Sequence, residues 1–313
     1  MKKILIFLCL LNGTNALCMQ KSLTQEQRAA KYLYLGRIAR EKGNLQEALK
    51  HYMLGSDLGC NYATIEAGAA NHLLRQRTLD DRKKKNLEDE ALRLFTLAAC
   101  DNSSIAQYNL GALHLSKNEY DLAIMWLRKA AIQNNPNAQY NLAVALIDKN
   151  KNTSDSEQRN RELLEAKVWL EIAILNGDAT ACNTLGIVYV EESKVAENAE
   201  EQMIGIRIAI KCFEKALELE PSIGKNIKFG EVKGDHVVLI QANKNLGATH
   251  EFLSRLEADP WKKEQLIDKS LEYHAQALQR GDLVVAPAAI HRIQPIKEGL
   301  RSARIARSLA AKN

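Results

Sequence analysis

Two side chains of the chain have the types and the spacing of a catalytic pair. Ser222 and Lys225 form the sequence S-x-x-K, which is the nucleophile motif of penicillin-recognising enzymes. No K-T-G sequence follows, and one such match is roughly what chance gives for this content of Ser and Lys. We therefore expect that the chain is not an enzyme, and a cell-wall or β-lactam-related hydrolase stays open as an alternative.

The histidines and cysteines show no pattern of a metal site, so we expect no metal and no cofactor. His114 and His250 fall on the core positions of a helical pattern, where a packed or hydrogen-bonded histidine is the expected role. The cysteines are irregularly spaced and include no C-x-x-C, which argues against a zinc ribbon. Cys60 and Cys100 are expected at neighbouring helix ends, where they form either one disulfide or two free thiols.

A repeated segment accounts for most of the remaining residues. The residues Ala-Gln-Tyr-Asn-Leu occur at 106–110 and again at 138–142. The wider pattern, small–x–x–x–apolar–small, has the spacing of one helical face. Because Gly inside a helix costs about 1 kcal/mol relative to Ala, its recurrence at one register predicts that another backbone approaches closely there. The copies begin at Lys31, Ala63, Ala106, Ala138, Ala181 and Ala242, and the fifth residue after each is Gly36, Gly68, Gly111, Ala143, Gly186 or Gly247.

A second helical pattern, small–x–x–x–large–x–x–small, follows each copy of the first. Its copies begin at Ala48, Ala91, Ala123, Ala166, Ala209 and Ser270. Each is followed by a residue suited to end a helix: Gly59, Asn102, Asn134, Gly177, Glu220 before Pro221, and Gly281. Capping patterns predict helix starts at Thr24, Asn44, Ser154, Asn135 and Asp259.

The two patterns lie either 17 or 28 residues apart. The difference of 11 residues is about three helical turns, so the longer copies should form taller hairpins with projecting polar tips. Residues 75–90 would form one such tip, and an irregular charged loop is the alternative for the tip near 150–160. The Gly-rich segment 221–234 lies outside the pattern and is predicted to be a long loop.

These residues resemble the Sel-one-like repeat family, a branch of the tetratricopeptide superfamily. The resemblance rests on AQYNLG, NAQYNLA and the segment that begins at Trp126, and it covers about 31–281. It implies an all-α, right-handed superhelical solenoid of about six antiparallel helix hairpins within 24–283, with units from about 24, 61, 103, 135, 178 and 235. It also implies a non-enzymatic adaptor whose extended surface binds a protein or peptide. Trp126 and Trp169 are expected in core or inter-repeat packing.

The two ends of the chain carry their own signals. Residues 1–16 have a positive start, a short apolar stretch and small residues at Thr14 and Ala16, which predicts a signal peptide cleaved after Ala16. The protein is then exported, to the periplasm or beyond, from a bacterium; an uncleaved buried segment is the alternative. Residues 284–313 predict a basic helix with six cations and only Glu298 as an acid, a net charge of +5. We expect Ile296, Leu300 and Ala303 to cover the last repeat, so that this helix caps the solenoid. A membrane-surface protein held by this helix is the alternative. Nucleic acid is not an expected partner, because no basic stripe with aromatic residues exists elsewhere.

The binding surface is predicted on the side of the first helices that faces away from their own partner helices. A lone amphipathic helix would be polar there, but this side is apolar. In tetratricopeptide-like solenoids it lines the concave groove, so we predict that it binds an extended peptide or an amphipathic helix, centred on Tyr108 and Tyr140. Some of its residues should pack against the next repeat instead. The set is Tyr62, Ile65, Ile105, Tyr108, Leu115, Tyr140, Val144, Ile147, Ile187 and Val190.

Overall fold

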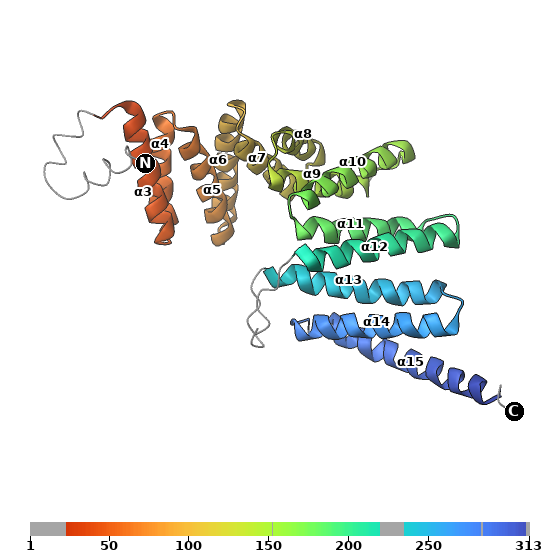
Figure 1. Cartoon of the computed structure of the whole chain (residues 1–313). Helices are drawn as coiled ribbons and strands as arrows, with labels where there is room; N and C mark the ends of the chain where they lie inside the picture. The colour runs from red at the N-terminus through yellow and green to blue at the C-terminus, as the bar shows by residue number, and fades with distance from the viewer. Residues whose placement is uncertain (1–22, 152, 220–234, 283, 311–313) are drawn as a thin grey trace. The chain divides into compact units, whose positions relative to one another are not determined.

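The computed structural model describes residues 23–151, 153–219, 235–282 and 284–310. These residues form α-helices joined by short turns, and the described part of the chain contains no strand (Figure 1). The predicted all-α fold is confirmed. The predicted signal peptide 1–16 and the loop 221–234, with Ser222 and Lys225, lie outside the described residues.

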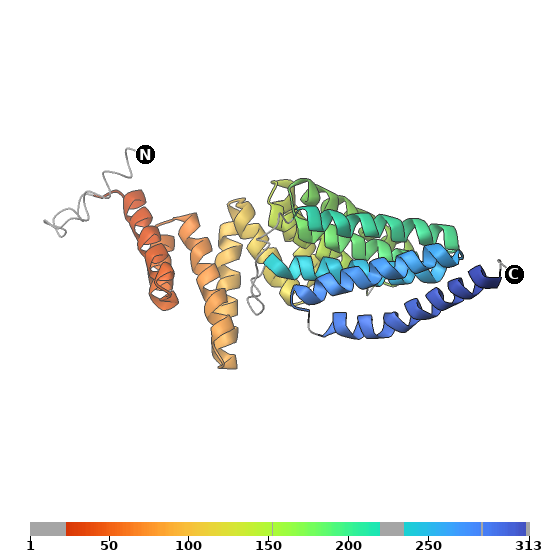
Figure 2. The same cartoon turned by 60° about the horizontal axis from the view of Figure 1, so that its bottom comes forward.

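The chain divides into two compact units, Met1–Lys149 and Asn150–Asn313. The N-terminal unit contains three antiparallel hairpins and one further helix: α3 (Gln25–Glu41), α4 (Leu45–Asp57), α5 (Asn61–Arg77), α6 (Asp81–Cys100), α7 (Ser104–Ser116), α8 (Tyr120–Ile132) and α9 (Pro136–Asn150, whose last residue belongs to the second unit). The C-terminal unit contains α10 (Ser156–Leu175), α11 (Ala179–Lys194), α12 (Ala199–Leu219), α13 (Asp235–Leu256), α14 (Pro260–Gln279) and α15 (Val285–Ala310). Figure 1 and Figure 2 both show α13 and α14, in blue, lying side by side.

The glycines of the first helices seat large side chains of the second helices. A Cβ built at Gly68 would lie 2.7 Å from the ring of Phe95, and one at Gly186 would lie 2.5 Å from the ring of Phe213. The same relation joins Gly36 to the ring of Tyr52. At these three glycines the nearest group is therefore a flat side chain and not the predicted backbone, and the ring reaches the helix because Gly has no Cβ. At Gly111, however, a Cβ would lie 2.6 Å from the Leu127 side chain and 3.0 Å from the Leu127 backbone nitrogen, so a close backbone approach does occur there.

Residues in the left-handed conformation end the second helices, as predicted. Asn102 and Asn134 have φ of 59° and 60°, and Gly59, Gly177 and Gly281 have φ of 83°, 88° and 110°. In this region Gly and Asn are tolerated while most side chains are strained.

The helix starts agree with the predicted caps in all but one case. Thr24 and Gln27 form a capping box before α3, and the Asp259 carboxylate accepts hydrogen bonds from Trp261 N and Lys262 N at the start of α14. Ser154, however, does not cap α10. The cap is Asp155, whose carboxylate accepts hydrogen bonds from two backbone N–H groups. A carboxylate is favoured there because it also meets the positive end of the helix dipole.

The long copies form taller hairpins, as their spacing predicts. α5 has 17 residues and α6 has 20, whereas α7 and α8 have 13 each. The additional turns join at 78–80, so residues 75–90 are helical on both sides of a short turn. In the stretch near 150–160, for which an irregular loop was the alternative, α9 ends at Asn150 and α10 begins at Ser156.

Candidate protein-binding surface

The first helices of successive hairpins in the N-terminal unit lie next to one another and form one side of the unit. α3 contacts α5 and α5 contacts α7, while α4 packs between α3 and α5 and α6 packs between α5 and α7. We call the solvent-facing side of α5, α7 and α9 the first-helix surface. It is the part of the chain where the sequence predicts a binding groove.

Two apolar side chains of the first-helix surface are open to solvent. Tyr62 on α5 is 62% exposed and Ile105 on α7 is 45% exposed. Tyr108, Tyr140 and three aliphatic residues are half-buried, so each shows part of its side chain: the aliphatic residues are Leu115, Val144 and Ile147. The surface therefore offers exposed apolar area with Tyr side chains, as the sequence predicts.

Ile65 is not part of this surface, although the sequence placed it there. It is 7% exposed and lies in a core cluster with Phe95 and Leu110. Ile65, Tyr108 and Tyr140 share one position of the repeat, two residues after the first small residue. Residues of α6 and of the next first helix, α7, enclose Ile65, whereas Tyr108 and Tyr140 are half-buried. Tyr108 and Tyr140 thus serve packing with one part of the ring and can meet a partner with the rest.

An amide network holds the buried Gln107, one of the two repeated Gln residues, which sequence analysis did not explain. Gln107 is 3% exposed and Gln139 is 1% exposed, so both polar side chains are buried. Each follows directly on a buried Ala. The Gln133 Nε2 group donates to Gln107 Oε1 at 2.7 Å, and Gln107 Nε2 donates to Asn102 Oδ1 at 3.1 Å. These bonds satisfy polar groups in the core and join α7 to the end of α8. The one available signal was the repetition of Gln itself.

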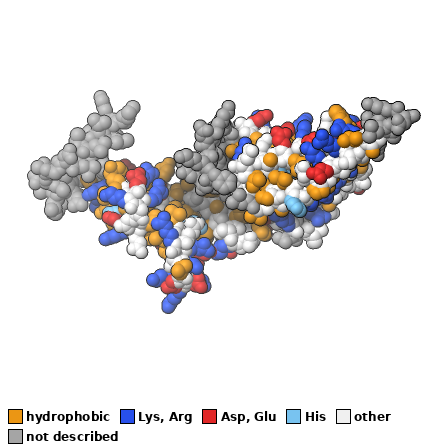
Figure 3. All heavy atoms as spheres, turned by 90° about the horizontal axis from the view of Figure 1, so that it is seen from below, with side chains coloured by type: hydrophobic (Ala, Val, Ile, Leu, Met, Phe, Trp, Pro, Cys, Tyr) orange, Lys and Arg blue, Asp and Glu red, His pale blue; other side chains and the backbone are white. Residues whose placement is uncertain are grey.

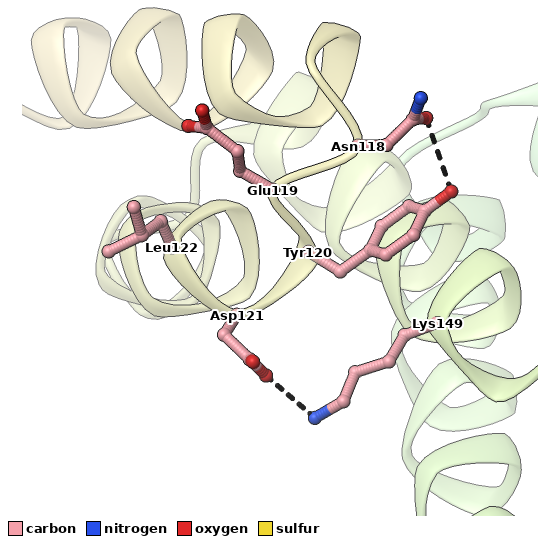
Figure 4. A pocket seen from close by; sticks show the side chains of 6 residues that line it. All are labelled: Asn118, Glu119, Tyr120, Asp121, Leu122 and Lys149. Atoms are coloured by element: carbon pink, nitrogen blue, oxygen red, sulfur yellow. Dashed lines mark hydrogen bonds and ion pairs between the residues drawn. The ribbon is translucent and has the colours of Figure 1, made fainter. Parts of the chain in front are cut away.

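A polar hollow of about 330 Å³ lies beside the turn between α7 and α8 (Figure 4). Its side chains are committed to one another: Lys149 Nζ lies 2.8 Å from Asp121 Oδ1, and Tyr120 donates its hydroxyl to Asn118 Oδ1 at 3.2 Å. A hydrogen bond from His114 holds the pKa of the neighbouring Glu119 carboxyl below its ordinary value. Glu119 and Leu122 complete the lining. The paired charges favour a structural role, which is to fix the turn.

The comparisons with known proteins agree with this architecture. The family model described as tetratricopeptide repeat matches residues 105–131, which are α7 and α8. A solved structure of pilF from Pseudomonas aeruginosa is similar with a TM-score of 0.54 and 11% identity, over 87% of this chain and 99% of that one. Residues 105–131 thus match one tetratricopeptide repeat, and the chain has the fold of a helical repeat solenoid.

Two further structures resemble this repeat protein. A Sel1 repeat protein from Oxalobacter formigenes has a TM-score of 0.46 and 18% identity, over 87% of this chain and 99% of that one. A tetratricopeptide protein from Thermus thermophilus has a TM-score of 0.46 and 16% identity, over 75% of this chain and 99% of that one. No curated protein matches the chain.

In the C-terminal unit of the repeat protein the equivalent positions are more polar. Ile187 on α11 is 39% exposed, but Val190 packs against the cluster that contains Phe213 and is half-buried. Asn245 Nδ2 on α13 donates to Asn183 Oδ1 on α11 at 2.9 Å. Ile187 and Val190 belong to the C-terminal unit, whereas the other residues of the predicted surface belong to the N-terminal unit.

The sequence left a disulfide between Cys60 and Cys100 and two free thiols as alternatives. Cys60 and Cys100 are both free thiols; Cys60 precedes α5 and Cys100 is the exposed last residue of α6. Cys182 is buried, and burial raises the pKa of its thiol to about 12 and that of Cys212 to about 11. Thiols with such a high pKa are poor nucleophiles and poor metal ligands at neutral pH.

Histidines and membrane-length helices give no further site. His114 is 8% exposed and His250 is 2% exposed, so both are core residues as predicted. His250 Nδ1 donates to the Leu246 carbonyl at 2.9 Å. Within the described residues we find no group of three His, Cys, Asp or Glu placed to hold a metal ion. No helix there is long and apolar enough to cross a membrane.

The basic helix α15 packs on the last hairpin and pairs its cations with acids. Ile293 is fully buried against Ile267 of α14, with Leu300 partly buried beside them. Of the residues expected to make this contact, Ile296 is instead 42% exposed, and Ala303 is exposed. The ion pairs are Arg292 to Glu251 at 2.6 Å, Lys297 to Asp268 at 2.8 Å, and Arg304 to Glu264 at 3.2 Å. The predicted capping helix therefore exists, with a contact face rotated relative to the prediction.

Proposed function

We propose that the chain is a non-enzymatic scaffold that binds an extended peptide or an amphipathic helix of a protein partner on the first-helix surface of its N-terminal unit. The observation that supports this is the exposed apolar pair Tyr62 and Ile105, with the half-buried rings of Tyr108 and Tyr140. An apolar strip with hydroxyl groups suits a partner that buries an apolar face and needs a few hydrogen bonds for orientation.

The binding test uses variants that leave the fold intact. Peptides are selected from a displayed library against the full-length chain, and their Kd is measured for the wild type and for a Tyr62→Ser, Ile105→Ser variant. Because both side chains are exposed, the helicity and Tm should not change. If both residues contact the peptide, we expect a loss of about 2 kcal/mol or more, which is about thirtyfold in Kd.

A matched control comes from the second helices. Leu97 on α6 is 53% exposed and Ile132 on α8 is 67% exposed, so a Leu97→Ser, Ile132→Ser variant removes similar apolar area from another side. The control should bind with unchanged Kd. Equal losses in both variants, or no loss in the first, would show that peptides do not bind through the first-helix surface.

Export is a further part of the proposal. It is supported by the sequence of residues 1–16, with its positive start, apolar stretch and small residues before position 17. The intact mass of the protein from its native cells tests it: a product that begins at Leu17 supports export, and a product that retains Met1 contradicts the signal peptide. The membrane alternative through α15 finds little support, because Arg292, Lys297 and Arg304 already have acidic partners.

A further inference from the structure

The tip of the hairpin α5–α6 projects from its unit. α6 ends nine residues after Ala91 and α8 ends nine residues after Ala123, so the two helices match at their far ends. The seven additional residues of α6 all precede Ala91, on the side of the tip. At 1.5 Å per residue they extend the hairpin by about 10 Å beyond the start of α8. We call residues 77–85 the hairpin tip.

The hairpin tip carries cations that have no acidic partner. Arg77, Arg82 and Lys85 are exposed and make no ion pair within the described part of the chain. Lys83 lies 4.0 Å from Asp80 and its side chain is 73% exposed. Figure 3 views this end of the hairpin, where Lys and Arg side chains gather beside hydrophobic ones.

The two acids of the hairpin tip are committed to local structure. The Asp80 carboxylate caps α6 by accepting a hydrogen bond from Lys83 N, and Asp81 Oδ1 lies 3.0 Å from Lys84 Nζ. Cations in the first turn of a helix are disfavoured by the helix dipole, by about 0.3–1 kcal/mol each. The run Arg82–Lys85 places three cations in this turn and a fourth directly after it, so helix stability does not explain the run.

A large apolar side chain stands at the apex of the same tip. Leu79 is 94% exposed, in the turn between the two helices. An exposed Leu in the same nine-residue tip as unpaired cations is suited to an anionic bilayer surface: the cations meet the headgroups and the apolar side chain enters the acyl boundary. A phosphate backbone of nucleic acid would use the cations but gives the Leu no apolar environment.

We propose that the hairpin tip docks the protein on membranes that carry anionic lipid headgroups, with Leu79 inserted and Arg77, Arg82 and Lys85 on the headgroups. This surface is separate from the first-helix surface and does not depend on it. The contrast with α15 supports the choice of the tip, since the three paired cations of α15 are neutralised within the protein.

The test is co-sedimentation of the full-length chain with vesicles. Vesicles of phosphatidylcholine with about 30 mol% phosphatidylglycerol should bind it, binding should weaken as salt rises, and pure phosphatidylcholine should bind at least tenfold less. Each cation near an anionic surface contributes about fivefold to partitioning, so the variant Arg77→Gln, Arg82→Gln, Lys85→Gln should lose at least tenfold. Leu79→Ser should lose several-fold, and this loss should persist at high salt because it is apolar.

A second triple variant separates a local site from net charge. Lys50, Arg207 and Lys211 are exposed cations without an ion pair among the described residues, and they lie far from the tip in the sequence. Their replacement by Gln changes the net charge equally and should leave vesicle binding unchanged. Equal losses in both triple variants would overturn the proposal. So would unchanged binding of the tip variant, or a tip that binds a fluorescent oligonucleotide but no vesicle.

Discussion

His274 occupies a position that neighbouring repeats give to a larger apolar ring. It stands four residues after Ser270 on α14, as Phe213 stands four residues after Ala209 on α12, and each ring covers a Gly of the preceding helix. His274 is 2% exposed, and neither ring nitrogen has a hydrogen-bond partner among the described residues. We predict that His274→Phe stabilises the C-terminal unit.

The expected gain follows from the two ring nitrogens. A neutral imidazole has one donor and one acceptor, and a buried polar group without a partner costs about 1–3 kcal/mol. The space over Gly247 also accepts a phenyl ring. A Cβ built at Gly247 would lie 2.7 Å from the His274 ring, and a Cβ built at Gly68 would lie at the same distance from the Phe95 ring. We therefore expect His274→Phe to raise the free energy of unfolding by about 1–3 kcal/mol.

The variant should also change the dependence of stability on pH. Burial lowers the pKa of His274 below the ordinary 6.5; Arg292 and Lys244 act in the same direction, and Glu251 and Asp282 oppose them. As pH falls through 6.5, the unfolded chain therefore takes up the proton before the folded chain does. Stability is lost with acidification from that point down to the folded-state pKa. Phe cannot titrate, so the variant should lose less stability in acid.

The assay is hydrogen exchange of α13 and α14 in increasing urea, at about pH 7.5 and about pH 5.5, because it reports on the C-terminal unit alone. Phe213→His is the reciprocal control and should destabilise the unit and add acid sensitivity. His250 also has a pKa lowered by burial, so some pH dependence should remain in His274→Phe. If His274→Phe lowers stability, or leaves the pH effect at its wild-type size, the ring nitrogens of His274 are hydrogen-bonded and the reasoning is wrong.

The other predictions concern the glycines that contact large side chains, and the last helix. Gly68→Ala should destabilise the N-terminal unit by about 1–3 kcal/mol, because its Cβ would lie 2.7 Å from the Phe95 ring. Gly299→Ala, where nothing lies within 4 Å of the added Cβ, should instead raise the Tm slightly. If urea unfolding gives equal changes in stability for both variants, the Phe95 ring does not require a Gly at position 68. Although burial opposes its ionisation, hydrogen bonds from Arg292 and Arg255 hold the pKa of Glu251 below its ordinary value. Glu251→Gln should therefore speed limited proteolysis of α15, and an unchanged cleavage rate would show that apolar packing alone holds this helix.

The sequence predicts the elements of this fold well because each depends on nearby residues. Spacings of three and four residues define the helices, and Gly or Asn ends them. The 11-residue difference between repeats predicts the taller hairpins for the same reason, since whole turns keep each face in register. Contacts between helices are harder to predict from the sequence. Ile65 and Tyr108 share a register, but only packing against the next repeat shows that one is enclosed and the other is not.

The two basic segments, α15 and the hairpin tip, show that a cluster of cations must be judged together with the acids that pair with it. Composition assigns the net charge of +5 to residues 284–313, which made the tail the first choice for an anionic surface. In the structure, however, α15 lies beside Glu251, Asp268 and Glu264, acids that precede their partners by 29 to 41 residues and that no local pattern connects to them. The tip of α5–α6 has fewer cations, but its acids are bound within the first turn of α6 and its remaining cations face solvent. The unpaired charge, and not the total charge, decides where an anionic partner gains most, so the projecting tip and not the tail is the surface to test first.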